Sequence, residues 1–191
     1  MEFEDVIRKR RTIRRFKPSP VPLETLKKLV DYARVAPQGS NNQALEYIII
    51  TNEEIRSQLF PLVRWAGALP PEMRNPEEGR RPMAYIIVLL NTKVKKEGNT
   101  DCGAAVENIL LGITYHGLGA CWQGAIDRPA IHALLELPDN LNVKYIVSIG
   151  YPDEESQMEE FSGDFKYWKS EDGKMHVPKK SLDDVILKIH Q

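Results

Sequence analysis

The sequence lacks three features: an excess of one charge, a long apolar run and a secretion signal. Its 26 lysines and arginines stand against 27 aspartates and glutamates, so no surplus positive field can hold a nucleic acid along its length. The longest apolar stretches, such as AYIIVLLN at 84–91, are strand-length and too short to cross a bilayer. The N-terminus MEFEDVIRKR has no apolar signal region. We therefore expect no nucleic-acid partner, no membrane and a cytoplasmic location.

Cysteine and histidine are also sparse. Cys102 and Cys121 form no C-x-x-C pair, and no histidine stands at metal-ligand spacing from them. The four histidines are scattered along the chain. These observations predict buried or reduced thiols and no metal site.

The common catalytic motifs are missing as well. The stretch GLGACWQG at 117–124 does not have the G-x-G-x-x-G spacing of a Rossmann turn. The chain has no G-x-x-x-x-G-K-[ST], no H-E-x-x-H and no G-x-S-x-G. The sequence therefore lacks the motifs that usually indicate phosphoryl transfer on a P-loop, zinc hydrolysis or serine esterase chemistry.

What the chain does contain is an alternation of helical and strand patterns, enough for one domain over residues 1–191. Apolar spacing and turn residues predict an α+β or α/β fold with about four core strands, and the segment 61–82 is expected to be irregular. The strands are expected at EYIII (46–50), AYIIVLL (84–90) and VKYIVSIGYP (143–152). The helices are expected around 3–9, 26–36, 51–60, 101–116, 128–138 and 181–189.

Two polar patches stand out from this pattern. RKRRTIRRFK at 8–17 has seven basic side chains in ten residues. Where this stretch is extended, Arg10 and Thr12 can point to one side and Arg11 to the other. The second patch, APQGSNNQ at 36–43, offers many hydrogen bonds to a polar planar ligand.

Each patch has a plainer interpretation when taken alone. The arginines could form a solvated face, and the Ser/Asn cluster could be an ordinary turn. The acidic run DEESQMEE at 153–160 is interpreted as a solvated loop.

The two patches belong to a series of motifs that follow one another along the chain. RRTIRRF (10–16), APQGSNNQ (36–43), DCGAAVENILLGITYHGLGACW (101–122) and IGYP (149–152) follow in this order, and HVPKKSLDDVI closes the chain. In content, order and spacing the series resembles the FMN-dependent nitroreductase family. The resemblance implies an α+β sandwich and a homodimer with two FMN sites at the subunit interface. The apolar helix 101–116, expected to be buried on all sides, suits the centre of such a dimer.

The resemblance also assigns roles to single residues. It implies that Arg10, Arg11 and Thr12 hold the phosphate and ribityl chain of FMN, and that Arg14 lies near the pyrimidine edge of the flavin. A compact group of guanidinium groups and a hydroxyl suits a phosphate that carries close to two charges. The residues that it implies reach the FMN from the other subunit are Pro37, Gln38, Gly39, Ser40 and Asn41, joined by Gln43.

The remaining implied contacts come from later in the chain. Trp122, Gln123 and Gly124 are expected beside the isoalloxazine. Lys179, with Lys180 as the close alternative, is expected at the phosphate, although a lysine lacks the bidentate fork of the family's usual arginine. Trp65 either covers the flavin on its substrate side or anchors the core.

The chain departs from the family at one further position. Ala44-Leu45 stands where many members have Pro-Trp, so the resemblance does not define the wall of the site at this point.

The implied activity follows from the cofactor more than from any side chain, so no acid or base is named. We expect NAD(P)H to reduce FMN and leave, after which a nitroaromatic, quinone or similar small oxidant is reduced in a ping-pong cycle. Two alternatives stay open. One is a reductive dehalogenase or flavin-destroying enzyme of the same fold, and the other is a flavin-binding module without turnover.

Overall fold

A central sheet with the strand order β1-β5-β3-β2, extended by β4 on β5, organises the chain. The structure, a computed structural model, describes residues 1–191. All named pairings in this sheet are antiparallel, and a single parallel bridge joins Thr12 to Ala120 at the outer edge of β4. The strands are β1 (Phe16–Lys17), β2 (Leu45–Ile50), β3 (Ala84–Asn91), β4 (Gly119–Gln123) and β5 (Leu141–Pro152).

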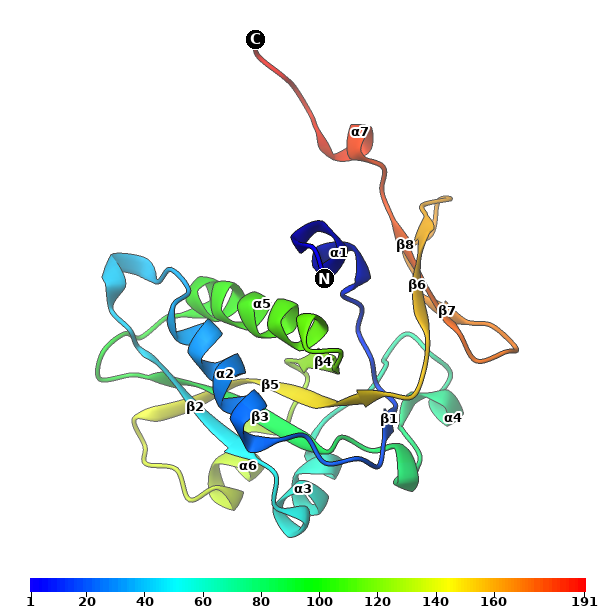
Figure 1. The fold of residues 1–191 in the computed structure, drawn as a ribbon. Helices are drawn as coiled ribbons and strands as arrows, with labels where there is room; N and C mark the ends of the chain where they lie inside the picture. The colour runs from blue at the N-terminus through cyan, green and yellow to red at the C-terminus, as the bar shows by residue number, and fades with distance from the viewer.

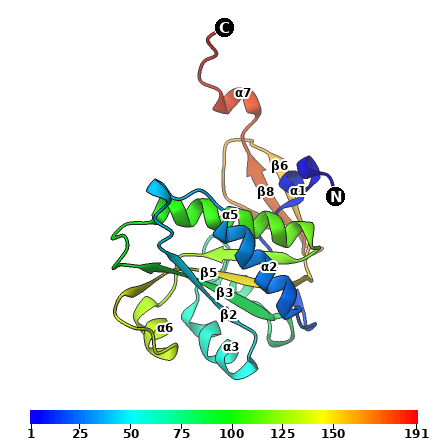
Figure 2. The same cartoon turned by 60° about the vertical axis from the view of Figure 1, so that its left-hand side comes forward.

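Helices cover both faces of the sheet (Figures 1 and 2). One face carries α2 (Leu23–Arg34) and α5 (Asn99–Tyr115), and the other carries α3 (Glu53–Leu59) and α6 (Arg128–Leu134). Alternate residues of β3 point into the two layers, so that Ile86 belongs to one apolar cluster and Ile87 to the other. The structure thus confirms the expected α+β sandwich.

Local chemistry explains where these helices begin and end. The Asn52 side chain accepts a hydrogen bond from the Ile55 N–H and starts α3, and Asp127 does the same for Ala130 at the start of α6. Helix α5 ends in a Schellman motif, in which the Leu118 N–H donates to the Ile113 carbonyl. Gly117 adopts the left-handed φ of 71° that this motif requires.

The segment 61–82 is irregular, as its prolines predict. It holds only short turns: the end of η2 (Phe60–Leu62), then α4 (Pro71–Arg74) and η3 (Glu78–Arg80). Helix α1 (Phe3–Lys9) precedes the basic stretch, and η1 (Gly39–Asn41) lies inside the Ser/Asn patch.

A second sheet follows the core, and the sequence pattern did not predict it. It consists of β6 (Ser156–Glu160), β7 (Trp168–Lys169) and β8 (Met175–Lys179), in the order β6-β8-β7. The expectation of a solvated acidic loop at 153–160 is wrong in two ways. Residues 156–160 form β6, and the Glu154 side chain is only 2% exposed because two arginine residues bind it.

The C-terminal helix is shorter than expected. The predicted capping box of Ser181 and Asp184 is present, but α7 spans only Leu182–Val185 and the chain then extends away from the body (Figure 1). The prediction of a helix to residue 189 is wrong because nothing in the chain packs against this segment, and short helices rarely persist without packing.

Helix α5 is less enclosed than its composition indicates. Its sheet side is buried, but Glu107 and Tyr115 are exposed and Leu111 is half-buried. The expectation of burial on all sides is therefore wrong for a single chain. Cys102 and Cys121 are free and buried, as predicted. No helix is both long and apolar enough to cross a membrane.

Candidate functional site

The basic stretch RRTIRRF (10–16) and the end of the third motif, which forms β4, lie against each other at the edge of the sheet. The Ile13 N–H donates to the Ala120 carbonyl at 2.8 Å, beside the bridge from Thr12 to the same residue. A Cβ at Gly119 would stand 2.8 Å from the Ile13 Cβ, so only glycine permits this approach. The basic stretch is thereby fixed along β4 at residues 12–13.

Arg11 is a guanidinium with no acidic partner. It is half-buried, and its Nη2 donates to the Arg8 carbonyl at 2.6 Å. Burial and the neighbouring Arg10 both lower its pKa. Arg10 has only a loose ion pair with the exposed Glu107, at 3.7 Å. Two adjacent guanidinium groups with so little counter-charge form a site that an anion would stabilise.

Arg14 is held more firmly than a solvated arginine would be. Its backbone N–H donates to Glu154 Oε1 at 2.6 Å, and its guanidinium lies 4.9 Å from the centre of the Tyr167 ring. Its Nε is buried and has no hydrogen-bond partner within the chain. It also lies beside Cys121, whose pKa burial raises to about 11 while Arg14 opposes the shift.

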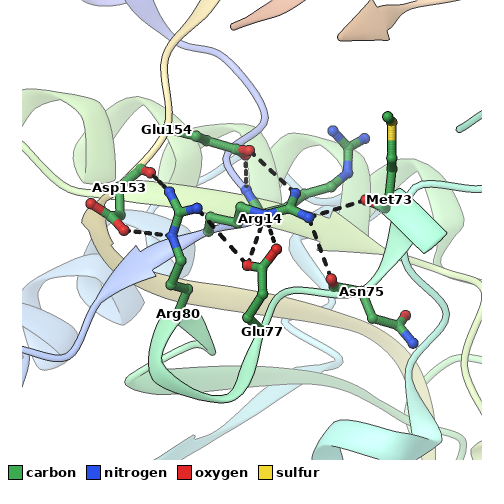
Figure 3. Close-up of polar contacts among 8 residues, drawn as sticks. Arg14, Met73, Asn75, Glu77, Arg80, Asp153 and Glu154 are labelled. Carbon is green, nitrogen blue, oxygen red and sulfur yellow. Dashed lines mark hydrogen bonds and ion pairs between the residues drawn. The ribbon is translucent and has the colours of Figure 1, made fainter. Parts of the chain in front are cut away.

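A network of charges behind Arg14 holds the segment 70–82 in place (Figure 3). Arg15 is buried; its Nε donates to Glu77 at 3.0 Å and its Nη1 lies 3.7 Å from Glu154. Its Nη2 donates to the Met73 and Asn75 carbonyls at 3.2 and 3.4 Å.

Arg80 completes the network. It donates to both the carboxylate and the backbone carbonyl of Asp153. The end of β5 and the segment after α4 are therefore joined through charged side chains around the backbone of Arg14.

The second patch forms an exposed, conformationally strained loop. Ser40, Asn41 and Gln43 have left-handed φ values of 53°, 50° and 51°. Asparagine tolerates this region, whereas serine and glutamine rarely adopt it. Non-glycine residues in such conformations persist only where the surroundings enforce them, and they concentrate at binding sites.

The two patches do not meet within one chain. The loop between α2 and β2 lies near one end of α5, and α1 with the adjoining basic stretch lies near the other end, in both views (Figures 1 and 2). The sequence order of the motifs does not reveal this separation.

The residues of β4 divide between the two faces of the sheet. Trp122 is exposed and packs edge-on against Tyr145, with ring centres 5.2 Å apart. The adjacent Gln123 is buried on the opposite face, where its Oε1 accepts a hydrogen bond from Ser148. The Gln123 Nε2 has no partner. Because side chains alternate along a strand, those of 122 and 123 cannot face one ligand from the same side. Gly124, just after the strand, lies close to Tyr145.

The remaining expected site residues are Lys179, Lys180 and Trp65. Lys179 is the last residue of β8, and Lys180 Nζ lies 5.8 Å from the centre of the Phe165 ring. Trp65 is 4% exposed and packs against Phe60 in the core layer of α3 and α6. This placement favours the core interpretation of Trp65.

Sequence reasoning missed three residues that shape the site. Glu154 stands in a run that resembles a solvated loop, and Tyr167 lies in a stretch with no motif. The sequence marks Asp101 only as the start of a helix. The available signals were the two acidic residues that follow IGYP, Asp153 and Glu154, and an aspartate at the start of an apolar helix, but neither signal identifies the partner of the residue.

Comparisons with known proteins bear on what this arrangement does. A sequence model of the Nitroreductase family matches residues 7–151. The chain belongs to the nitroreductase family. The match covers both polar patches and β4, and it confirms the resemblance that the motif series indicated.

Individual relatives agree with this assignment. An Archaeoglobus fulgidus protein named "Putative NADH dehydrogenase/NAD(P)H nitroreductase" is 30% identical over 159 residues, covering 79% of this chain and 86% of that protein. An iodotyrosine deiodinase from Thermotoga neapolitana is 27% identical over 166 residues, covering 78% and 88% of the two chains.

A solved structure gives the same picture. An FMN-dependent nitroreductase from Clostridium difficile R20291 superposes with a TM-score of 0.67 at 25% identity, over 81% of this chain and 90% of that one. The FMN dependence of this neighbour agrees with the expectation of FMN as the cofactor.

Proposed function

We propose that this nitroreductase-family protein is an FMN-dependent oxidoreductase that takes reducing equivalents from NAD(P)H. It passes them to a nitroaromatic, a quinone or a similar small oxidant. The observation that carries this proposal is the half-buried Arg11 beside Arg10, fixed along β4. The pair has one acidic neighbour, the exposed Glu107 at 3.7 Å from Arg10. A terminal phosphate supplies the missing counter-charge.

The phosphate side of the site rests on three residues. Arg10 and Arg11 supply charge-assisted donors, and the Thr12 hydroxyl adds a donor from the same extended segment. The contact of Ile13 with Gly119 holds this segment in register with β4. Lys179, or Lys180 beside it, adds a further cation for the phosphate.

The ring side of the site rests on polar atoms that lack partners within the chain. Arg14 Nε, Gln38 Oε1 and Gln123 Nε2 are buried and unbonded, and buried polar groups normally have partners. When bound, FMN supplies hydride and electron chemistry between NAD(P)H and the oxidant, in a ping-pong order. The chain's task is to orient the ring, with Arg14 beside its pyrimidine edge and β4 along it.

The loop at 37–43 serves the site of a second copy. It lies away from the arginines of its own chain, so a homodimer is needed to bring both patches to one flavin.

An apolar groove beside α5 supports the dimer. The groove is lined by Phe3, Tyr32, Val35, Leu111 and Tyr115. The C-terminal arm extends from the body with its apolar residues exposed, Leu187 fully so at 101%. Exposed apolar surfaces of this kind mark an interface.

A reductive dehalogenase is the second candidate, because a relative named iodotyrosine deiodinase matches most of the chain. The two activities share the flavin site and differ in the oxidant. A flavin-binding module without turnover is the third.

One anaerobic experiment separates the candidates. The purified protein is loaded with FMN, and its visible spectrum is followed as NADH or NADPH is added. Fast bleaching, followed by reoxidation with a nitroaromatic or quinone, supports the proposal. Reoxidation only by an iodinated phenol favours the dehalogenase, and a protein that stays yellow is a binding module. A chain that takes up no FMN contradicts all three.

A further inference from the structure

The loop at 37–43 poses a physical problem. Its residues 39–43 are exposed, and three of them hold left-handed backbone angles. Such conformations are unfavourable for residues other than glycine, and least so for asparagine. Its own hydrogen bonds, such as Asn41 N–H to the Gln38 carbonyl at 2.9 Å, are local turns. Something outside the loop must therefore hold it.

The restraint comes from a buried carboxylate on α5. Asp101 Oδ1 accepts a hydrogen bond from the Gly39 backbone N–H at 3.0 Å, and Oδ2 accepts one from Lys95 Nζ at 2.6 Å. The Asp101 side chain is only 6% exposed. A side chain at position 39 would place its Cβ 3.0 Å from Lys95 Nζ, so glycine lets the three groups meet closely.

Asp101 does not serve its own helix. Acidic residues in a first turn usually favour the free N–H groups there, and Gly98 at the N-cap of α5 supplies no capping side chain. Both hydrogen bonds of Asp101 nevertheless leave the helix, one to the loop and one to the segment after β3. The carboxylate therefore joins three parts of the chain.

The charge on Asp101 is well supported. The hydrogen bond from Lys95, followed by that from Gly39, holds its pKa below the usual range. Asp101 therefore stays ionised at neutral pH. We call its two hydrogen bonds, from Gly39 and from Lys95, the clamp.

We infer that Asp101, paired with Lys95, is a positioning residue that holds the loop in the shape that reaches the flavin of the partner subunit. This inference rests on the proposed function. Asp101 touches no cofactor itself; it acts through Gly39 and the strained residues that follow. Without the clamp, the loop would relax toward ordinary backbone angles and lose its alignment with the ring.

Substitutions at both ends of the clamp test this role. Asp101→Ala removes both hydrogen bonds, Asp101→Asn keeps an oxygen that can accept from Gly39, Lys95→Met removes the cation, and Lys95→Arg keeps it. Glu24→Gln is the matched control, because Glu24 pairs with Lys27 at 2.8 Å on the exposed face of α2. Hydrogen–deuterium exchange of peptides covering 37–45 and 84–91 is measured with the FMN Kd.

The expected result is local. Asp101→Ala should raise the FMN Kd about ten- to a hundredfold, the scale of a lost charge-assisted hydrogen bond. Asp101→Asn and Lys95→Met should give smaller losses, and Lys95→Arg should retain the wild-type affinity. Exchange should rise in the 37–45 peptide and stay unchanged in the β3 peptide. Riboflavin affinity should fall by the same factor, because the loop's amides suit the ring and not the phosphate.

Contrary outcomes are distinct. Unchanged FMN affinity and exchange in Asp101→Ala overturn the inference. Exchange that rises equally in both peptides shows a general loss of stability and also overturns it; if Asp101→Ala does not fold, the same two measurements on Lys95→Met decide the question. A wild-type protein that takes up no FMN defeats the proposed function instead, while the exchange data still show whether Asp101 holds the loop.

Discussion

Neighbouring arginines of the basic stretch have different surroundings, and these differences set their roles. Arg11 has no acidic partner, Arg14 lies over Tyr167, and Arg15 is buried among carbonyls and carboxylates. Arg8, by contrast, pairs with Glu4 on the exposed face of α1. The sequence alone could indicate that the basic stretch binds an anion. It could not separate the buried Arg15 from its neighbours, because the partners of Arg15 lie about 60 and 140 residues away along the chain.

At the residue scale, Arg10→Ala should weaken FMN binding by about 1.5–3 kcal/mol, the range of a hydrogen bond to a charged group. Riboflavin lacks the phosphate, so its affinity should change much less. Titrating both ligands into the apoprotein measures the two losses. Arg34→Ala, on the exposed face of α2, is the control. Equal losses for both ligands would move Arg10 away from the phosphate.

Arg14→Gln should lower the two-electron potential of the bound flavin by tens of millivolts. A guanidinium at the pyrimidine edge favours the reduced, more negative form of the ring, and about 30 mV corresponds to 1.4 kcal/mol in a two-electron couple. Hydride acceptance from NAD(P)H should slow in step. Spectroelectrochemical titration measures the midpoint, with Arg8→Gln as the solvated control. Matching midpoints for Arg14→Gln and wild type would place Arg14 away from the ring.

At the element scale, the apolar patterns predicted the central strands and the helices that cover them. Strands β2, β3 and β5 carry apolar runs, and caps such as Asn52 mark the helix starts. The second sheet escaped prediction because β6 reads SQMEE, a polar strand with no apolar alternation. The prediction made α7 too long because a capping box marks where a helix begins and does not indicate where it ends.

The charged network behind Arg14 gives an element-scale prediction. Arg15→Met should destabilise the fold by about 3–5 kcal/mol, because it leaves the buried Glu154 without its cationic partner. It should also release the segment 70–82, since Arg15 binds Met73, Asn75 and Glu77. Limited trypsin digestion followed by mass spectrometry should show faster cleavage after Arg74.

A second variant isolates the cause. Adding Glu154→Gln to Arg15→Met removes the stranded charge and should recover part of the stability, while the segment stays released. Restored protection of Arg74 in the double variant would contradict the role of Arg15 as the anchor of this segment.

At the scale of the whole molecule, one chain exposes apolar side chains along α5 and along the C-terminal arm. The groove beside α5 is apolar, and the C-terminal arm displays Leu182, Val185 and Ile189 to solvent. Ending the chain after Lys180 should raise the dimer dissociation constant at least tenfold, because the arm's apolar area is lost from the interface. Every buried residue of the core precedes this point, so chain folding should be retained.

Sedimentation velocity over a range of concentrations measures the effect of the truncation. Lys188→Ala keeps the apolar residues of the arm and serves as the control. An unchanged dimer in the truncated chain would show that the arm is not part of the interface. The proposed site takes residues from both copies, which predicts that FMN and the dimer stabilise one another by linkage. Apoprotein should then dissociate more readily than holoprotein.

The central claim is that one flavin is held by the arginine cluster of one copy and the 37–43 loop of another. A mixed dimer tests it directly. One copy carries Arg10→Ala with Arg11→Ala, the other carries Asn41→Ala with Gln43→Ala, and two different tags allow the heterodimer to be purified. Both homodimers should bind FMN weakly. The heterodimer should bind one FMN with wild-type affinity, because one of its two sites combines the intact arginines with the intact loop. A heterodimer with no wild-type site would show that each flavin is held within a single chain, and would contradict the account.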